Sequence, residues 1–193
     1  MRLNLYLRLP AALFLSLPLC SAGVVDRVAI VIGKTVVTES EVLDELRLTE
    51  FINEQPLDLG PAARRAAAER LVDQELIRRE LEMGGYAKPS ASEADALLRN
   101  FRQSRFHSLA EYRAATRKYG IAEEQLKHHL LWQLTAIRFT DSRFGSVEAD
   151  GGLQSADRAA PGAPATSVDR QMDAWLKQAR ADTKITFKEE AFQ

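Results

Sequence analysis

The two ends of the chain carry strand patterns, whereas the long stretches between them have helical patterns. Val24–Ile32 is rich in β-branched residues, Gly33-Lys34 interrupts it and Thr35–Val37 resumes it, which predicts a hairpin. Near the other end, Lys184–Lys188 alternates polar and apolar residues, the pattern of a half-buried strand. A two-stranded hairpin is marginal in water, and a lone strand has no pairing partner. The sequence therefore predicts a mainly α domain with a small antiparallel sheet formed by the N-terminal hairpin and the C-terminal strand.

Start and stop signals divide the middle of the chain into helices. Pro61 stands at a favoured first helical position, and its helix is expected to run to about Met83, before Gly84-Gly85. A Ser or Thr with Glu three residues later has capping-box spacing, and it predicts three further starts. These pairs are Thr38/Glu41, Ser90/Glu93 and Ser108/Glu111, and the first of these helices is expected to end at about Asn53.

The segment from about Ala122 to Phe139 carries two apolar seams. A surface helix needs only one apolar stripe, so two seams indicate a helix packed between neighbours. We expect this helix to be central to the core, and a short amphipathic helix to begin at Val168. The first seam is Leu126, Leu130, Leu134 and Ile137, and the second is Trp132, Ala136 and Phe139.

Residues 1–22 have the three regions of a secretory signal peptide. Two arginines give a positive start, an apolar stretch follows, and Cys20-Ser21-Ala22 supplies small residues for cleavage. The apolar stretch is shorter than the roughly 20 residues that cross a bilayer as a helix. We expect cleavage directly after this segment, export of the remainder, and no transmembrane segment. Lipoprotein processing at Cys20 is disfavoured because the preceding residue, Leu19, is large.

Three segments are informative in combination. They are the opening run Val25–Gly33 with Thr35–Glu41, the segment Arg70–Ile77, and the helix of Trp175 with the strand Lys184–Lys188. Together they resemble SurA-type periplasmic chaperones. That family usually carries one or two parvulin-type peptidyl-prolyl isomerase modules before its closing helix and strand. The resemblance therefore implies the chaperone core without an isomerase module, because too little chain is left here to form one.

The resemblance covers about residues 24–144 and 167–189. Residues 145–167 are rich in Gly, Pro, Ala and Ser and are expected to be a flexible linker. The expected parts are a signal peptide at 1–22, a domain like the SurA N-terminal domain at 23–144, the linker, and a helix and strand at 168–193 that complete the same domain. By resemblance, the chain is a periplasmic, ATP-independent holdase that binds unfolded envelope proteins, with outer-membrane β-barrel precursors as its clients.

No catalytic or cofactor motif stands out. The net charge is −1, without the basic excess of a nucleic-acid-binding protein, and Cys20 is the single cysteine, which excludes a disulfide framework. His128 and His129 are neighbours on a helix and point about 100° apart, so we do not expect them to share a metal ion. His107-Ser108 lacks a third partner for a triad, and Ser108 is better explained as a helix cap. We expect no enzyme activity, no cofactor, no metal and no nucleic-acid partner.

A holdase needs accessible apolar contacts of modest affinity. Aromatic side chains on the two short middle helices and at the end of the first helix are candidates for contacting an unfolded polypeptide. The alternative for each of them is an ordinary place in the core. The candidates are Phe51, Ile52, Phe101, Phe106, Tyr112 and Tyr119.

Two other functions stay open at this point. One is a protein of the peptidyl-prolyl isomerase family with residual foldase activity. The other is a structural assembly subunit of an envelope complex, whose apolar groove holds one permanent partner.

Overall fold

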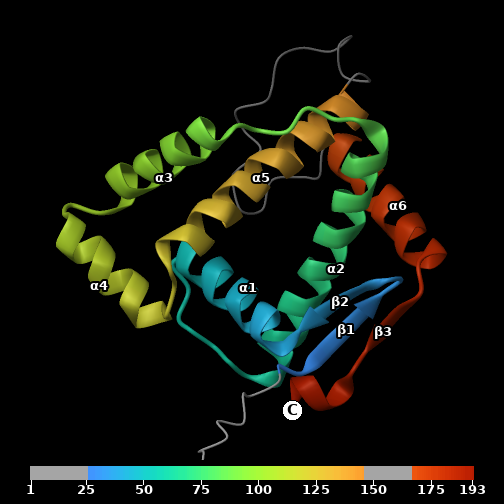
Figure 1. Cartoon of the computed structure of the whole chain (residues 1–193), viewed down its shortest axis with the longest axis horizontal. Helices are drawn as coiled ribbons and strands as arrows, with labels where there is room; N and C mark the ends of the chain where they lie inside the picture. The colour runs from blue at the N-terminus through green and yellow to red at the C-terminus, as the bar shows by residue number, and fades with distance from the viewer. Residues whose placement is uncertain (1–25, 146–166) are drawn as a thin grey trace, which may run out of the picture.

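The computed structural model describes residues 26–145 and 167–193. The predicted signal peptide and the interior of the predicted linker lie outside these residues. Six helices and a three-stranded sheet make up the described part, which confirms the mainly α fold (Figure 1). In chain order they are β1 (Val28–Ile32), β2 (Thr35–Thr38), α1 (Glu39–Ile52), α2 (Pro61–Gly84), α3 (Ala91–Arg105), α4 (Leu109–Tyr119), α5 (Glu123–Phe144), α6 (Ser167–Asp182), β3 (Ile185–Phe187) and the 3-10 helix η2 (Glu189–Phe192).

The sheet joins the two ends of the described chain. Its strand order is β2-β1-β3, and both pairings are antiparallel. Ile30 lies opposite Phe187, and Ile32 lies opposite Ile185. The tail strand therefore docks beside the leading hairpin, as the two strand patterns predict.

Two of the three capping boxes predicted from the sequence are present in the structure. Thr38 and Ser90 each accept a hydrogen bond from the N–H of the Glu three residues on, and that Glu accepts one in return. At the third site, Ser108 Oγ accepts from the Glu111 N–H at 3.1 Å. The Glu111 carboxylate does not bond back to Ser108; it accepts instead from the His107 N–H at 2.8 Å. Ser108 is thus a helix cap, and the reciprocal bond reaches one residue further back.

Helix α5 differs in two ways from the two-seam prediction. It continues to Phe144, beyond the expected end at Phe139, because Phe144 is buried against α2 and α6. The first seam also does not run its full length, since Leu126 and Leu130 are buried but Ile137 is 56% exposed. The helix is nevertheless central, because it packs against α1, α3 and α6.

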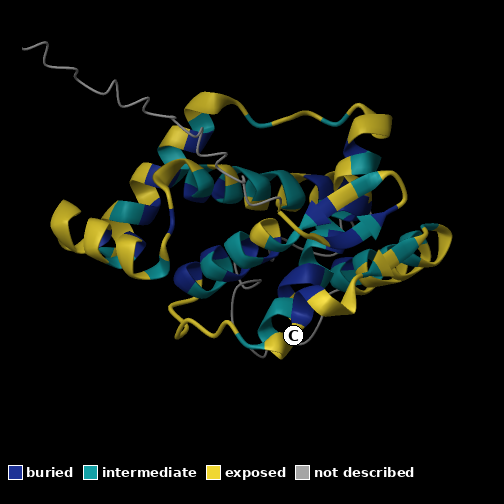
Figure 2. Cartoon of the chain, turned by 60° about the horizontal axis from the view of Figure 1, so that its bottom comes forward, coloured by how far each residue is buried: buried dark blue, intermediate teal, exposed yellow. Residues whose placement is uncertain are grey.

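The core consists of three clusters, and buried residues accordingly occur at several places along the molecule (Figure 2). The sheet cluster joins the sheet, η2 and the facing sides of α1 and α2. The aromatic cluster lies between α1, α3, α4 and the first half of α5. The junction cluster joins the C-terminal halves of α2 and α5 to the start of α6. Its buried members are Ile77, Leu81, Phe139, Phe144 and Val168.

Candidate functional site

Helices α3 and α4 form an arm, residues 91–119, that projects from the rest of the molecule (Figure 1). Helix α3 packs against α5, and α4 packs against α1. The short connection at 106–108 between the two helices lies at the outer end of the arm. The arm therefore presents the aromatic cluster close to the surface.

All six predicted contact residues belong to or pack against the aromatic cluster. The Phe51 ring stacks on Phe106 with centroids 6.1 Å apart and meets the Tyr119 ring edge-on at 5.5 Å. Phe106 in turn meets the Tyr112 ring edge-on at 5.4 Å. The structure thus brings together residues that are up to 68 positions apart in the sequence, from Phe51 to Tyr119.

Burial divides the six residues into two groups. Phe51, Ile52, Phe101 and Tyr112 are buried, so the core alternative describes them, and they form the floor of the cluster. Phe106 and Tyr119 are half-buried and keep accessible ring surface. Tyr119 also donates a hydrogen bond to the Gln55 carbonyl at 2.7 Å, which fixes its orientation.

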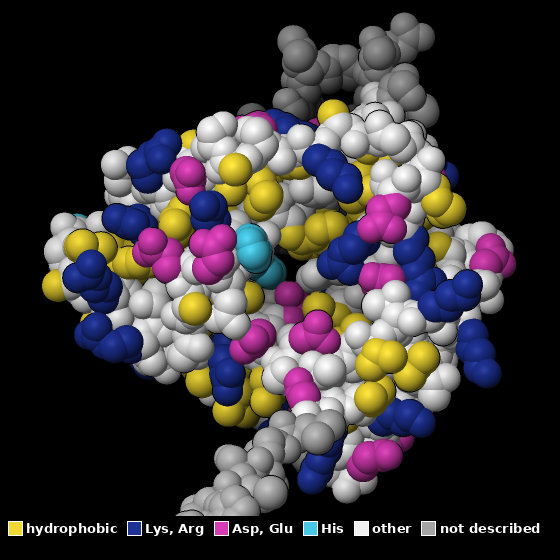
Figure 3. Space-filling view, in the orientation of Figure 1, with side chains coloured by type: hydrophobic (Ala, Val, Ile, Leu, Met, Phe, Trp, Pro, Cys, Tyr) yellow, Lys and Arg dark blue, Asp and Glu magenta, His cyan; other side chains and the backbone are white. Residues whose placement is uncertain are grey.

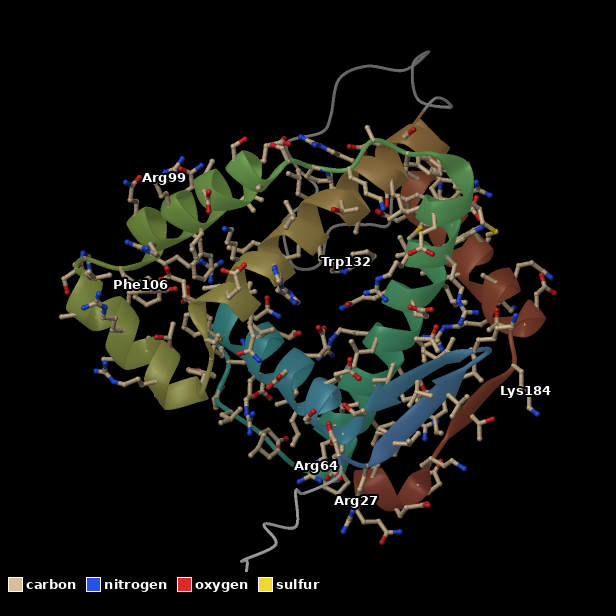
Figure 4. All side chains as sticks on the ribbon, in the orientation of Figure 1. Arg27, Arg64, Arg99, Phe106, Trp132 and Lys184 are labelled. Carbon is tan, nitrogen blue, oxygen red and sulfur yellow. The ribbon has the colours of Figure 1, made fainter. Side chains whose placement is uncertain are left out.

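A cavity of about 300 Å³ opens between the end of α3 and the start of α4. We call it the arm cavity. Its apolar side is made by Phe106, Tyr112 and Leu109, which is 46% exposed. Figure 4 labels Phe106, at the turn into α4, and Arg99, on α3. The polar side of the cavity is made by Arg99, Arg102, Gln103, His107 and Ser108.

Sequence reasoning missed the cationic residues of this cavity. Between positions 99 and 119 the chain has six arginines and lysines against one acid, Glu111, although its net charge is only −1. That local imbalance was a readable signal, but the average over the whole chain conceals it. Figure 3 shows Lys and Arg side chains along the outer edge of the arm.

A second cavity, of about 190 Å³, lies between α1, α2 and α5, and we call it the central cavity. Figure 3 shows histidine side chains beside a hollow in the middle of the molecule, and Figure 4 labels Trp132 there. The lining of the central cavity includes the buried Glu45 carboxylate. Glu45 accepts hydrogen bonds from Arg70 Nε at 3.2 Å and Thr49 Oγ1 at 3.1 Å, and its other oxygen lies 3.5 Å from His129 Nδ1.

The groups of the central cavity are engaged with one another. Burial alone would raise the pKa of Glu45. Hydrogen bonds with His129 and Gln74, together with the charges of His129 and Arg70, hold that pKa below its usual value. The carboxylate thus joins α1 to α2 and α5 as an anion. We interpret this cavity as a structural polar network.

The two adjacent histidines face different partners, as their spacing predicts. His128 Nε2 lies 3.2 Å from Glu124, whereas His129 faces Glu45. Within residues 26–145 and 167–193, no three His, Cys, Asp or Glu side chains gather as they would around a metal ion. None of the helices in those two ranges is both long enough and apolar enough to cross a membrane.

No family model matches this chain, and no curated protein matches it significantly. The arm cavity and the central cavity are therefore compared by the residues that line them. The arm cavity combines accessible apolar surface with cations at its rim. In the central cavity, the buried carboxylate already has its partners.

Proposed function

We propose that this protein is an ATP-independent chaperone that holds unfolded polypeptide at the arm cavity. The observation that carries the proposal is the cavity of about 300 Å³ whose apolar side is made by half-buried Phe106, exposed Leu109 and buried Tyr112. A client side chain can enter this cavity while the buried floor stays packed.

The site suits weak and reversible binding. Of the predicted aromatics, only Phe106 and Tyr112 line the arm cavity, and Tyr112 is buried, so a client segment gains a small number of apolar contacts. Ordering a flexible segment costs free energy that offsets part of this gain. Release then needs no nucleotide, which agrees with a holdase that hands its client on.

The proposed compartment is the periplasm, and the proposed clients are unfolded envelope proteins. Residues 1–22 support export, because they have the charge and apolar pattern of a signal peptide. The resemblance to SurA-type chaperones favours outer-membrane β-barrel precursors as clients. Such precursors expose alternating apolar side chains before they insert into the membrane.

The proposal is tested by diluting urea-unfolded β-barrel membrane proteins into buffer with and without the purified chain. We expect light scattering from client aggregation to fall at near-equimolar chaperone. The Leu109→Ser variant should suppress aggregation several-fold less well, because it removes exposed apolar surface from the arm cavity.

The matched control is Ile137→Ser, which removes an aliphatic side chain that is 56% exposed, against 46% for Leu109, from α5, outside the cavity. This variant should protect clients as well as the unaltered chain does. Failure of the unaltered chain to protect any of several clients, or equal losses in both variants, contradicts the proposal.

A further inference from the structure

The polar side of the arm cavity has a charge of one sign. Arg99, Arg102 and His107 line it, and no acidic residue does. Two carboxylates lie nearby and are already engaged. Glu111 accepts from the His107 N–H, and Glu123 lies 3.6 Å from Arg102.

Arg99 is the cation in this cavity that keeps its charge available. It forms no salt bridge within the described residues. Asp95, one turn earlier on α3, forms its salt bridge with Lys127 at 2.6 Å, and the charge of Arg99 makes only the smallest contribution to its lowered pKa. Arg99 is also exposed, so an anion can reach it without displacing another side chain.

The first turn of α4 adds backbone donors at the same place. Ser108 Oγ satisfies the Glu111 N–H, and the Ser108 carbonyl accepts from Tyr112 N–H. The N–H groups of Leu109 and Ala110 have no acceptor in the part of the chain that the structure describes. Unpaired amides at the positive end of a helix favour an anion.

Tyr112 gives a second and independent indication of a missing polar partner. Its side chain lines the cavity and is only 2% exposed, and its hydroxyl has no hydrogen-bond partner within the described residues. A buried polar group without a partner is unfavourable, and a ligand acceptor relieves that cost. Burial raises the pKa of Tyr112 to about 12, together with the charge of Glu123 and a weak contact with its carboxylate that falls short of hydrogen-bond geometry. The hydroxyl therefore remains a donor at neutral pH.

We propose that the arm cavity selects client segments in which a carboxylate stands next to an apolar side chain. The carboxylate binds Arg99 and the first turn of α4, while the apolar side chain packs on Phe106 and Leu109. This inference rests on the proposed function, because it names the segment that the same site prefers. The carboxylate can belong to an Asp or Glu side chain or to a chain terminus.

The test measures binding of fluorescein-labelled peptides to the full chain by anisotropy. One internal pair differs only in Phe-Asp against Phe-Asn, and a second pair ends in Phe with a free or an amidated carboxyl group. We expect the carboxylate peptide of at least one pair to bind about tenfold more tightly, the effect of a charge-assisted hydrogen bond. The pair that shows the preference identifies the source of the carboxylate.

Arg99→Gln should reduce that preference to less than twofold. The matched control is Arg113→Gln, an exposed arginine on α4 that does not line the cavity, and it should keep the preference. Equal binding within both pairs overturns this inference but leaves the chaperone proposal standing, provided that client aggregation is still suppressed. A preference that Arg99→Gln retains, or that both variants lose equally, also overturns it, because the arm's overall charge or another surface then binds the carboxylate.

Discussion

The sheet end of the molecule and the arm differ in how completely they bury their apolar side chains. At the sheet end, strands from the beginning and the end of the described chain pair directly, and Ile30 and Ile32 are completely buried between them and the helices. In the arm, two consecutive helices cover the aromatic cluster only in part, so Phe106 stays half-buried and Leu109 exposed. The first region closes the domain, and the second leaves apolar surface available for a partner.

The arginines of the two regions also differ in whether they have ion-pair partners. At the sheet end, Arg65 lies 3.8 Å from the centre of the Phe187 ring and pairs with Glu69 and Glu189. In the arm, Arg99 has no such partner within the described residues. Charges at the sheet end are therefore paired with one another, whereas at the arm cavity Arg102 lies 3.6 Å from Glu123 and Arg99 has no salt bridge within the described residues.

The substitution with the largest expected effect disrupts the sheet end. Ile30→Asp places a charge without a partner in a fully buried position between β3 and the helices, so we expect the chain not to fold. Circular dichroism and resistance to proteolysis measure this. Val28→Asp, on the same strand but 39% exposed, should remain folded. A cooperatively folded Ile30→Asp variant contradicts the closing role of the sheet.

An intermediate effect is expected in the arm. Phe101→Ala removes a ring that lies 5.7 Å from Phe51 and should destabilise the protein by about 3 kcal/mol. Hydrogen exchange should show faster opening of α3 and α4 than of the sheet. Leu109→Ala serves as the control and should change stability much less, because its side chain is already exposed. If the sheet and the arm open together in Phe101→Ala, the two regions are not energetically distinct.

The smallest effect concerns acid and the buried carboxylates that connect the helices. Hydrogen bonds from Thr35, Arg79 and Arg78 outweigh burial and lower the pKa of Glu75, as the partners of Glu45 lower its pKa. A lowered pKa in the folded state gives stability that is present above the unfolded value near 4.5 and lost as the pH falls below it. Urea unfolding at several pH values should therefore show a falling free energy of unfolding below about pH 4.5.

The Glu45→Gln variant sharpens this result, because it removes one of the carboxylates whose pKa is lowered in the folded state. Its stability should depend less steeply on pH below about 4.5 than that of the unaltered chain. Glu82→Gln, which changes an exposed carboxylate of α2, is the control. An unchanged slope in Glu45→Gln would show that Glu45 does not contribute to acid sensitivity.

Local sequence signals predicted the elements well but placed some ends wrongly. The caps at Thr38 and Ser90 and the stop at Gly85, whose φ is +65°, follow from the preferences of single residues and their close neighbours. The end of α5 was predicted too early, because Phe144 is held by contacts with other helices. Such contacts have no local sequence pattern.

The amino-acid sequence by itself determined the strands at the two ends and the order of the helices. These follow from backbone preferences and from the periodicity of apolar residues, which act over a few positions. Only the tertiary structure decided that Phe51 is buried and Phe106 half-buried, that Glu45 meets His129, and that Arg99 shares a cavity with Tyr112. Burial and charge pairing depend on which helices face each other, and that is set by contacts between residues far apart in the chain.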